Sequence, residues 1–285
     1  ADPELEWCPP GHGDIYTALL ASGLLDALLD KGYRYAMTAN SDNLGAVPSA
    51  RIAGWFAASG APYAPEMCRR TPADVKGGHL AVRKSDGRII LRDTAQTPED
   101  QMHYFTDQFR HPFFHTNNLW FDLKVLRDTL AERGGILGLP LIKNSKTVDP
   151  ADSSSVPVIQ LETAMGAAVE AFEGATAIEV PRSRFLPVKT TNDLLLVRSD
   201  VYEVDDDGLL QMVPERACTV KLDPRFYKKI QDFEARFPDG VPSIKGAQSL
   251  TVEGDWTFGS GVVATGEALV SQEGSPGRIA DGARI

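Results

Sequence analysis

A loop rich in proline and glycine, EWCPPGHGDIY at residues 6–16, holds the first side chains whose spacing suits chemistry. Its prolines favour extended backbone, while Gly11 and Gly13 permit left-handed or crowded conformations and close approach of a ligand. His12 lies between the glycines, and Asp14 suits the start of a helix. Since a helix N-terminus attracts anions, the loop is a candidate phosphate site, with an ordinary tight turn as the alternative.

Asp42 is the candidate metal ligand. It follows the apolar segment Tyr33–Thr38, which we expect to be a strand, and lies in the polar loop NSDN. A carboxylate at the end of a strand can hold Mg²⁺ against a phosphate. Asp and Asn are also common turn residues, so a turn without a metal stays open.

Two further loops offer polar groups to a ligand. DVKGG, residues 74–78, joins Lys76 to a glycine pair ending at Gly78, as in a phosphate-contacting loop or simply the entry to a hairpin. HTNNLW, residues 115–120, offers neighbouring amides that could bind sugar hydroxyls, although such amides also cap and turn the chain.

Positive charge gathers around Lys189 in PRSRFLPVKTTNDLLLV. Lys189 lies between an apolar run and two threonines, close in sequence to Arg182 and Arg184. Such cations beside an apolar strand need compensation, so we expect at least one of them to have an anionic partner.

Other polar residues give weaker signals. Glu162 in QLETAMGAAVEAF could bind a ligand, but we favour a closely packed, alanine-rich helix there. His79, His103 and His111 do not have the spacing of metal ligands. The sequence lacks the GxSxG, HExxH and P-loop signatures, so it gives no support to acyl transfer, zinc proteolysis or Walker-type ATP hydrolysis.

The elements that position these residues alternate between helix and strand. This order favours an open α/β sheet with ligands at the loops beyond its strands. Two alternating apolar runs around Asp86-Gly87 predict a hairpin. Apolar periodicity predicts helices within residues 14–32, 48–60, 98–109, 121–135, 161–174 and 221–240.

The C-terminal part has a different pattern, in which short β-branched runs are separated by glycine, as in residues 248–271. Such spacing suits stacked short strands. It predicts a parallel β-helix, with a plain β-meander as the alternative.

Composition narrows the class of protein. The 285 residues are 42% hydrophobic, which is enough for one large domain or for a large and a small one. A net charge of -10 disfavours nucleic acid as a partner. Three widely spaced cysteines, the lack of a long apolar run and an acidic N-terminus predict a cytoplasmic protein that does not enter a membrane. The sequence does not begin with Met, which suggests a fragment.

Several long motifs, in this order, resemble the eukaryotic-type UTP–glucose-1-phosphate uridylyltransferases, also called UDP-glucose pyrophosphorylases. The motifs are WCPPGHGDIY, NSDNLGA, ADVKGG, TNNLW, VIQLETAMGAA and PRSRFLPVKTTNDLLLV. The resemblance implies a partial Rossmann-like nucleotide-diphosphosugar transferase α/β domain at residues 1–220. A connecting helix at 221–240 and a left-handed parallel β-helix at 241–285 would follow.

The same resemblance implies the reaction of UTP with glucose 1-phosphate to give UDP-glucose and pyrophosphate, with Mg²⁺ as cofactor. The sugar phosphate would attack the α-phosphorus in line, without a covalent intermediate. Lys189 is the implied catalytic residue, which would contact the phosphates, and Asp42 the implied Mg²⁺ ligand.

The implied contacts with substrate are assigned position by position. Gly11 would face the uracil or ribose and His12 the sugar phosphate, while Asn117 would hydrogen-bond the glucose. The segment Asn40, Ser41 and Asp42 would lie at the nucleotide. Lys76, Gly78 and Glu162 are further candidates for substrate binding.

The sequence departs from the family pattern in three places. His115 stands where the family usually has asparagine, the glycine-rich N-terminal nucleotide loop with its catalytic lysine is not among these residues, and the C-terminal cap is short. If a second chain supplies the N-terminal part, an active enzyme is expected. The alternatives are a fragment that only binds sugar nucleotide and an oligomerising structural module. Assembly into a homo-oligomer also stays open.

Overall fold

The computed structural model describes residues 7–71, 74, 77–94, 97–149, 152 and 154–285. The chain forms two compact units. The first contains residues 1–40 and 48–182, and the second contains residues 41–47 and 183–285. The predicted domain limits at residues 220 and 240 stay predictions.

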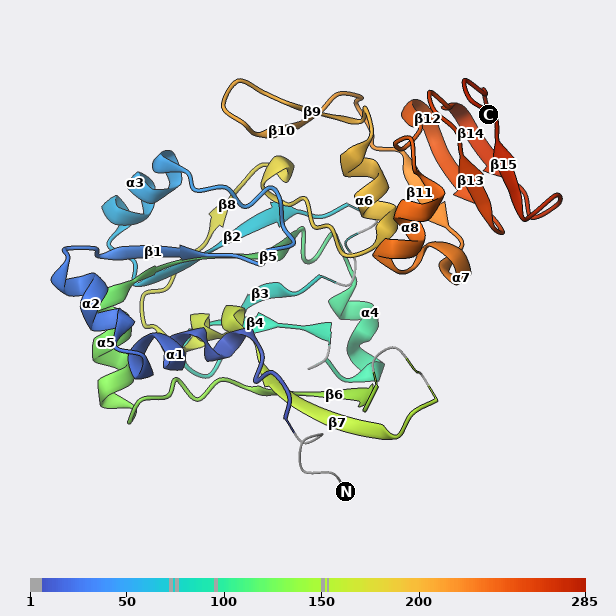
Figure 1. The fold of residues 1–285 in the computed structure, drawn as a ribbon. Helices are drawn as coiled ribbons and strands as arrows, with labels where there is room; N and C mark the ends of the chain where they lie inside the picture. Colours follow the sequence, from blue (N-terminus) through green and yellow to red (C-terminus); the bar gives the residue numbers. More distant parts are fainter. Residues whose placement is uncertain (1–6, 72–73, 75–76, 95–96, 150–151, 153) are drawn as a thin grey trace. The chain divides into compact units, whose positions relative to one another are not determined.

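The first unit is built on a four-stranded mixed sheet with the order β1-β5-β2-β8 (Figure 1). The strands are β1 (Tyr35–Thr38), β2 (Tyr63–Arg69), β5 (Phe113–Asp122) and β8 (Ile178–Glu179). β5 pairs antiparallel with β1 and β2, and β8 pairs parallel with β2. The predicted α/β class and the strand expected before residue 38 are confirmed.

The predicted helix over residues 14–32 is interrupted. It consists of η2 (His12–Asp14), α1 (Ile15–Ala21) and α2 (Leu24–Asp30). Gly23 adopts φ 74°, a left-handed conformation that ends one helix and begins the next, so the prediction of one continuous helix was wrong. Of the apolar face expected on this segment, Leu25 is buried in the core that contains α5 (Leu123–Glu132), while Leu24 is exposed. The other members of that face are partly buried against the same core, and they are Ile15, Leu19, Leu20, Leu28 and Leu29.

The other predicted helices of this unit differ in outcome. α3 (Ala50–Ser59), capped by the Ser49 hydroxyl, and α5 are confirmed. Residues 98–109 form only η5 (Glu99–Gln101) and α4 (Met102–Phe105). Residues 161–174 are not one helix, because the segment begins as the end of a strand and continues as the 3₁₀ helix η6 (Met165–Ala171).

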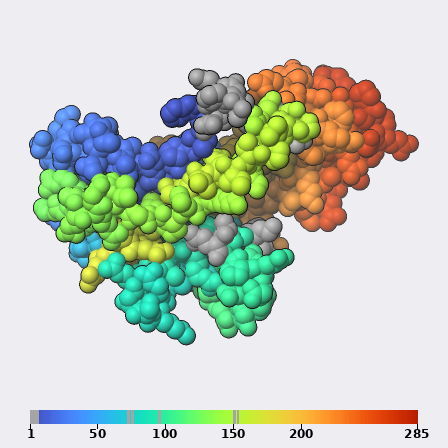
Figure 2. All heavy atoms as spheres, turned by 90° about the horizontal axis from the view of Figure 1, so that it is seen from below, coloured from blue at the N-terminus to red at the C-terminus, as the bar shows by residue number. Residues whose placement is uncertain are grey.

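Two hairpins complete the first unit. The predicted hairpin around Asp86-Gly87 is confirmed as β3 (His79–Val82) and β4 (Ile89–Arg92). β6 (Leu141–Thr147) pairs with β7 (Pro157–Thr163), a strand that ends at the candidate site. Figure 2 shows this second hairpin as a yellow-green strip on the surface.

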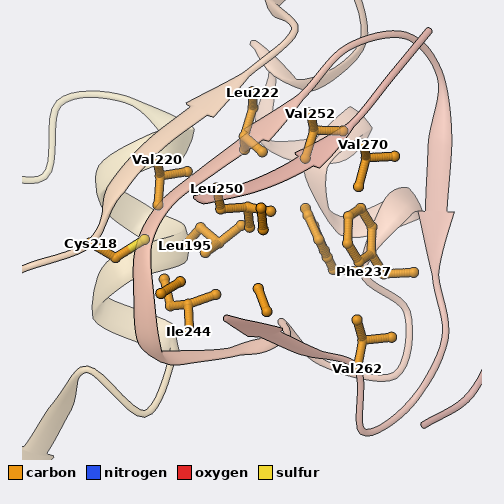
Figure 3. Packing of buried hydrophobic residues seen from close by; sticks show 14 of the residues in the cluster. Leu195, Cys218, Val220, Leu222, Phe237, Ile244, Leu250, Val252, Val262 and Val270 are labelled. Carbon is orange, nitrogen blue, oxygen red and sulfur yellow. The ribbon is translucent and has the colours of Figure 1, made fainter. Parts of the chain in front are cut away.

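The second unit stacks short parallel strands. Two of its sheets are β11-β12-β14 and β13-β15, and within these two every strand pairing is parallel. The strands are β11 (Thr219–Leu222), β12 (Ser243–Val252), β13 (Trp256–Phe258), β14 (Val263–Val270) and β15 (Gly277–Ile279). Their inward side chains form one core with Leu195 of α6 (Thr191–Arg198) (Figure 3). Parallel pairing between strands separated in sequence differs from the antiparallel pairing of a meander.

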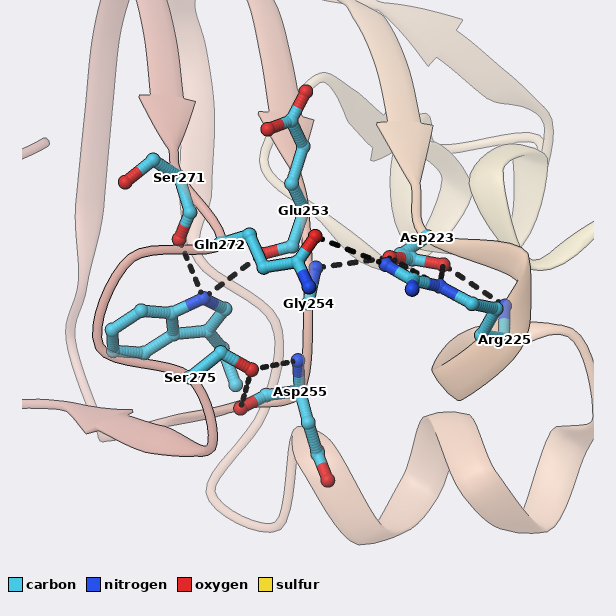
Figure 4. A network of polar contacts seen from close by, with 9 residues as sticks. Asp223, Arg225, Glu253, Gly254, Asp255, Ser271, Gln272 and Ser275 are labelled. Carbon is cyan, nitrogen blue, oxygen red and sulfur yellow. Dashed lines mark hydrogen bonds and ion pairs between the residues drawn. The ribbon is translucent and has the colours of Figure 1, made fainter.

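The segment 221–240 was predicted as one helix, but it contains two short ones, α7 (Pro224–Tyr227) and α8 (Ile230–Arg236). Asp223 caps α7 and also accepts from the Gly254 N–H at 3.0 Å, which ties the helix to the turn after β12 (Figure 4). A small hairpin, β9 (Tyr202–Val204) with β10 (Leu210–Met212), and η7 (Arg182–Arg184) precede these elements. None of the described helices is long and apolar enough to span a membrane.

Candidate functional site

The glycine-rich loop lies directly against the end of β7. The Thr163 N–H donates to the Pro10 carbonyl at 3.0 Å. Gly11 adopts φ 86°, and a Cβ there would lie 2.5 Å from the Thr163 carbonyl oxygen. At Gly13 a Cβ would lie 2.8 Å from the Thr163 carbonyl carbon. Both glycines are therefore required by packing of this loop against β7, whether or not a ligand is bound.

We expect Gly11→Ala to lower the free energy of unfolding by about 2–4 kcal/mol, because it combines a left-handed backbone with a backbone clash. Gly60→Ala is the comparison variant, since Gly60 also has a positive φ, 67°, here in the αL region, but has nothing within 4 Å of its Cβ position. The control should cost only about 1 kcal/mol. Urea denaturation of both variants measures the difference, and equal losses would show that the contact with Thr163 contributes nothing.

His12 is held in one tautomer by the backbone. Its Nδ1 accepts from the Met165 N–H at 2.9 Å, so the ring proton lies on Nε2. Burial lowers the pKa of His12, and the nearby carboxylate of Glu162 opposes that shift. The ring is therefore neutral at pH 7 and offers an Nε2–H donor to a ligand oxygen.

Met165, which donates to His12, is itself held by several hydrogen bonds. Its carbonyl accepts from the Tyr16 hydroxyl at 2.9 Å and the Tyr63 hydroxyl at 3.0 Å. Both tyrosines are buried, and burial raises the pKa of each hydroxyl. Thr38 Oγ1, at the end of β1, also donates to the Met165 sulfur at 3.6 Å. The chain at Met165 thus has a rigid support from α1, β1 and β2.

A bulge in β5 presents Asn117. The register between β5 and β2 shifts between Pro65 and Met67, so that residues 116–118 lie opposite Glu66 alone. Asn117 adopts φ 64°, the one left-handed non-glycine residue among those described. Its Nδ2 donates to Asn40 Oδ1 at 2.7 Å, which brings together two predicted substrate contacts.

Glu66 supports this bulge from the interior. Its side chain is fully buried and accepts from Asn118 Nδ2 at 3.0 Å and from the Trp120 indole N–H at 2.9 Å. Its carbonyl accepts from the Thr116 hydroxyl at 2.8 Å. Glu66 therefore anchors the strand on both sides of Asn117, before it through its main-chain carbonyl and after it through its carboxylate.

His115 lies beside Asn117 in the same bulge. Its Nδ1 accepts from the Asn117 N–H at 3.1 Å, which places the proton on Nε2, and this buried nitrogen has no hydrogen-bond partner among the described residues. Burial, followed by the nearby His12, lowers the pKa of His115 to about 4. A Cβ at Gly166 would lie 2.7 Å from His115 Cε1, so only glycine allows η6 to pack this closely.

We expect His115 to make stability depend on pH. The unfolded chain protonates this ring as the pH falls below 6.5, whereas the native ring stays neutral until about 4. The contribution of this ring to the free energy of unfolding is therefore complete above pH 6.5. It decreases towards pH 4 and is smaller by about 2 kcal/mol at pH 4.5. His115→Asn, which keeps an acceptor for Asn117, should remove this part of the dependence of stability on pH. Urea denaturation at a series of pH values measures that slope. The exposed His103→Asn should leave it unchanged, and identical slopes for native protein and His115→Asn would contradict the assignment.

Asp42 and Lys189 lie on paired segments within the second unit. The Val188 N–H donates to the Asp42 carbonyl at 2.8 Å, and Asn43 pairs antiparallel with Pro187. Asp42 Oδ1 is buried, and no hydrogen-bond partner lies within the part of the chain that the structure describes. Lys189 is exposed, and its N–H donates to Asp193 Oδ2 at 3.0 Å. The segments that carry the predicted metal ligand and the predicted catalytic lysine are thus adjacent.

The two arginines near Lys189 bind other groups of the protein. Arg182 forms an ion pair with Asp74 in the first unit, with N–O distances of 2.7 and 3.0 Å, which confirms an anionic partner for one of these cations. Burial raises the pKa of Asp74, but hydrogen bonds from Arg182 and Thr71 outweigh it, so the net pKa is lowered. Arg184 is buried and donates to the Val47 carbonyl.

The remaining candidates have different surroundings. The Gly78 carbonyl accepts from the His115 N–H at 2.7 Å, which places Gly78 beside the bulge. Glu162 is in β7, where it accepts from Asn144 Nδ2, and not in the expected helix. Ser41 is exposed at the start of the second unit. Lys76 lies outside the described residues.

Sequence reasoning missed the residues that support the site, which are Tyr16, Tyr63, Glu66 and Met165. Only Glu66 carried a usable signal, as an acid within the otherwise apolar run YAPEM. A charged residue inside a buried strand needs partners, and here the partners are the bulge side chains.

Comparison with known proteins identifies the family. The model of the family UTP–glucose-1-phosphate uridylyltransferase matches residues 1–264. The chain belongs to this family. It is 42% identical to the uridylyltransferase of Solanum tuberosum, over 98% of this chain and 57% of the relative. It is 40% identical to that of Saccharomyces cerevisiae, over 93% of this chain and 52% of the relative.

Solved structures agree with this uridylyltransferase assignment. A mutant of UDP-glucose pyrophosphorylase from Leishmania major in complex with UDP-glucose matches with a TM-score of 0.86 and 45% identity, over 100% of this chain and 62% of that one. UDP-glucose phosphorylase from Trypanosoma brucei matches with a TM-score of 0.87 and 44% identity, again over 100% and 62%. The mixed α/β architecture with a sheet core is therefore that of UDP-glucose pyrophosphorylases. The chain spans 57% of the first uridylyltransferase relative.

Proposed function

We propose that this chain carries the sugar-nucleotide site of an enzyme that forms UDP-glucose and pyrophosphate from UTP and glucose 1-phosphate. One observation carries the proposal. Within the first unit, motifs distant in sequence meet around one point, where His12 bonds Met165, Gly166 approaches His115, and Asn117 bonds Asn40. The family and the UDP-glucose complex of the Leishmania major relative give the substrate class.

The chemistry needs positioning and neutralisation of charge, which fixed polar groups supply. We assign to His12 Nε2–H a hydrogen bond to the sugar phosphate and to Asn117 a hydrogen bond to a glucose hydroxyl. Gly11 would face the uracil or ribose from the loop that packs against β7. Asn40, which accepts from Asn117, would join the sugar contact to the nucleotide contact.

In the second unit, we assign the phosphate contact to the exposed ammonium of Lys189. Asp42 would hold Mg²⁺, and its buried Oδ1 without a partner fits that role. Among the described side chains no group of three or more His, Cys, Asp or Glu is arranged to bind a metal, which suits an ion held by one carboxylate together with substrate phosphates. Bound there, Mg²⁺ would neutralise charge on the phosphates.

The finer architecture is part of the proposal. The parallel pairing of β11, β12 and β14 supports a parallel β-helix, for which we propose the left-handed form. We propose that the first unit is part of a Rossmann-like domain. We also propose that the protein is cytoplasmic. The active form would have the full length of the family's members, carried on one chain or on two.

The alternative is a chain that binds sugar nucleotide without transferring it, and an experiment separates the two. Calorimetry with UDP-glucose tests binding to the 285-residue chain, and a pyrophosphate-release assay with UTP, glucose 1-phosphate and Mg²⁺ tests the full-length form. Binding together with release that stops on chelation of Mg²⁺ is expected. Binding without release in the full-length form would favour the alternative. The absence of both binding and release would overturn the proposal.

A further inference from the structure

Two tyrosine hydroxyls of the first unit converge on one main-chain carbonyl. Tyr16, in α1, and Tyr63, the first residue of β2, both donate to the Met165 carbonyl, at 2.9 and 3.0 Å. Their oxygens lie 3.2 Å apart, so either hydroxyl could also donate to the other. All three residues are buried. Two buried hydroxyls therefore hold a carbonyl for which one donor would be enough.

Met165 also holds His12, through its other main-chain group. It is the first residue of η6, where an N–H has no partner within the helix, and this N–H donates to His12 Nδ1 at 2.9 Å. His12 itself is exposed. Among the described residues, the Met165 N–H is the only hydrogen-bond partner of the His12 ring. The orientation of this ring therefore depends on where Met165 lies.

The tyrosine rings are packed independently of their hydroxyls. The Tyr16 ring meets the Phe121 ring edge-on, with centroids 5.7 Å apart, and the Tyr63 ring stacks on Phe172 at 5.3 Å. Phenylalanine rings could make the same contacts. Burial raises the pKa of both hydroxyls, so both keep their protons at pH 7. What the hydroxyls add to this packing is two donors that fix Met165.

We propose that Tyr16 and Tyr63 are positioning residues for His12, which they fix through the Met165 main chain in the orientation and tautomer that present Nε2–H. This role rests on the proposed function, in which that Nε2–H binds the sugar phosphate. Without the two hydroxyls Met165 can shift, so its bond to Nδ1 weakens. The ring can then turn, or carry its proton on Nδ1, and either change removes the donor from the phosphate.

The test observes the His12 ring by ¹⁵N NMR, in the 285-residue chain without substrate, at about pH 8, where an imidazole is neutral. A protonated and an unprotonated ring nitrogen give widely separated signals, which approach each other when the two tautomers exchange. His12→Asn assigns the signals, because they disappear in that variant. We expect separated signals in the native chain. In the double variant Tyr16→Phe, Tyr63→Phe the two signals should move towards each other.

Tyr227→Phe is the matched control. Tyr227 is also buried, and its hydroxyl donates to a main-chain carbonyl, that of Trp256, at 2.7 Å in the second unit. Its loss should lower the thermal unfolding temperature about as much as one of the single variants does. The His12 signals should stay where they are in the native chain, because this hydroxyl has no contact with Met165.

Calorimetry with UDP-glucose gives the second readout. We expect the double variant to bind about tenfold more weakly, and each single variant, which retains one hydroxyl on Met165, to lose less than about threefold. If the double variant does not fold, the single variants decide, because each should move the ring signals part of the way.

Three results would overturn the positioning role. They are unmoved ring signals in the folded variants, equal movement in Tyr227→Phe, and moved signals with a native affinity for UDP-glucose. A native chain that does not bind UDP-glucose, with ring signals that move as expected, has a different meaning. The proposed function would then fail, while the positioning of His12 by the two tyrosines would stand.

Discussion

We expect Lys189→Ala to lower the rate of UDP-glucose formation by about 100- to 1,000-fold in the full-length form, because the role proposed for this cation is to stabilise charge on the reacting phosphates. The fold should not change. Lys189 is exposed, and the bond that it makes to Asp193 comes from its main-chain N–H, which alanine retains. The capping box between Thr190 and Asp193 at the start of α6 also stays intact. The measurement is pyrophosphate release over a range of substrate concentrations, which gives kcat and KM separately.

Two companion variants make this result specific. Lys228→Ala removes an exposed lysine elsewhere in the second unit and should leave kcat unchanged. Lys189→Arg keeps the positive charge but changes its geometry, so we expect an intermediate rate. If Lys189→Ala and Lys228→Ala have the same kcat as the native enzyme, Lys189 has no role in the transfer.

The sequence predicted those elements whose local pattern agrees with their packing. The apolar stripe of α5, the strand before Asn40 and the hairpin around Asp86-Gly87 are all present. The parallel pairing in the second unit is consistent with its glycine-spaced, β-branched runs. In each case local propensity and tertiary structure favour the same conformation.

The failures occur where tertiary contacts override local propensity. The alanine-rich segment 161–174 suggested a helix, but its first residues pair with β6, and Gly166 must pass close to His115. No local pattern marks the bulge at Asn117, because it depends on Glu66 about fifty residues earlier. The strong motifs therefore gave candidate residues, whose roles stay predictions, while the residues that hold them in place were missed.

The buried anchor Glu66 gives the second large effect. We expect Glu66→Ala to lower the free energy of unfolding by about 3 kcal/mol, because the Asn118 amide and the Trp120 indole each lose a buried acceptor. The affinity for UDP-glucose should fall as well, because the bulge that directs Asn117 towards Asn40 loses its support. Urea denaturation followed by circular dichroism measures the first effect, and calorimetry measures the second.

Glu66→Gln separates the loss of an acceptor from the loss of volume. Its amide oxygen can serve only one of the two donors, while its NH₂ group faces the other, so the loss should be about half that of Glu66→Ala. Glu132→Ala, at an exposed acid that ends α5, should change stability by less than about 0.5 kcal/mol. A Glu66→Ala protein as stable as the Glu132→Ala control would mean that the bulge is held by its backbone alone, and Asn117 would then owe its position to the β-sheet register and not to Glu66.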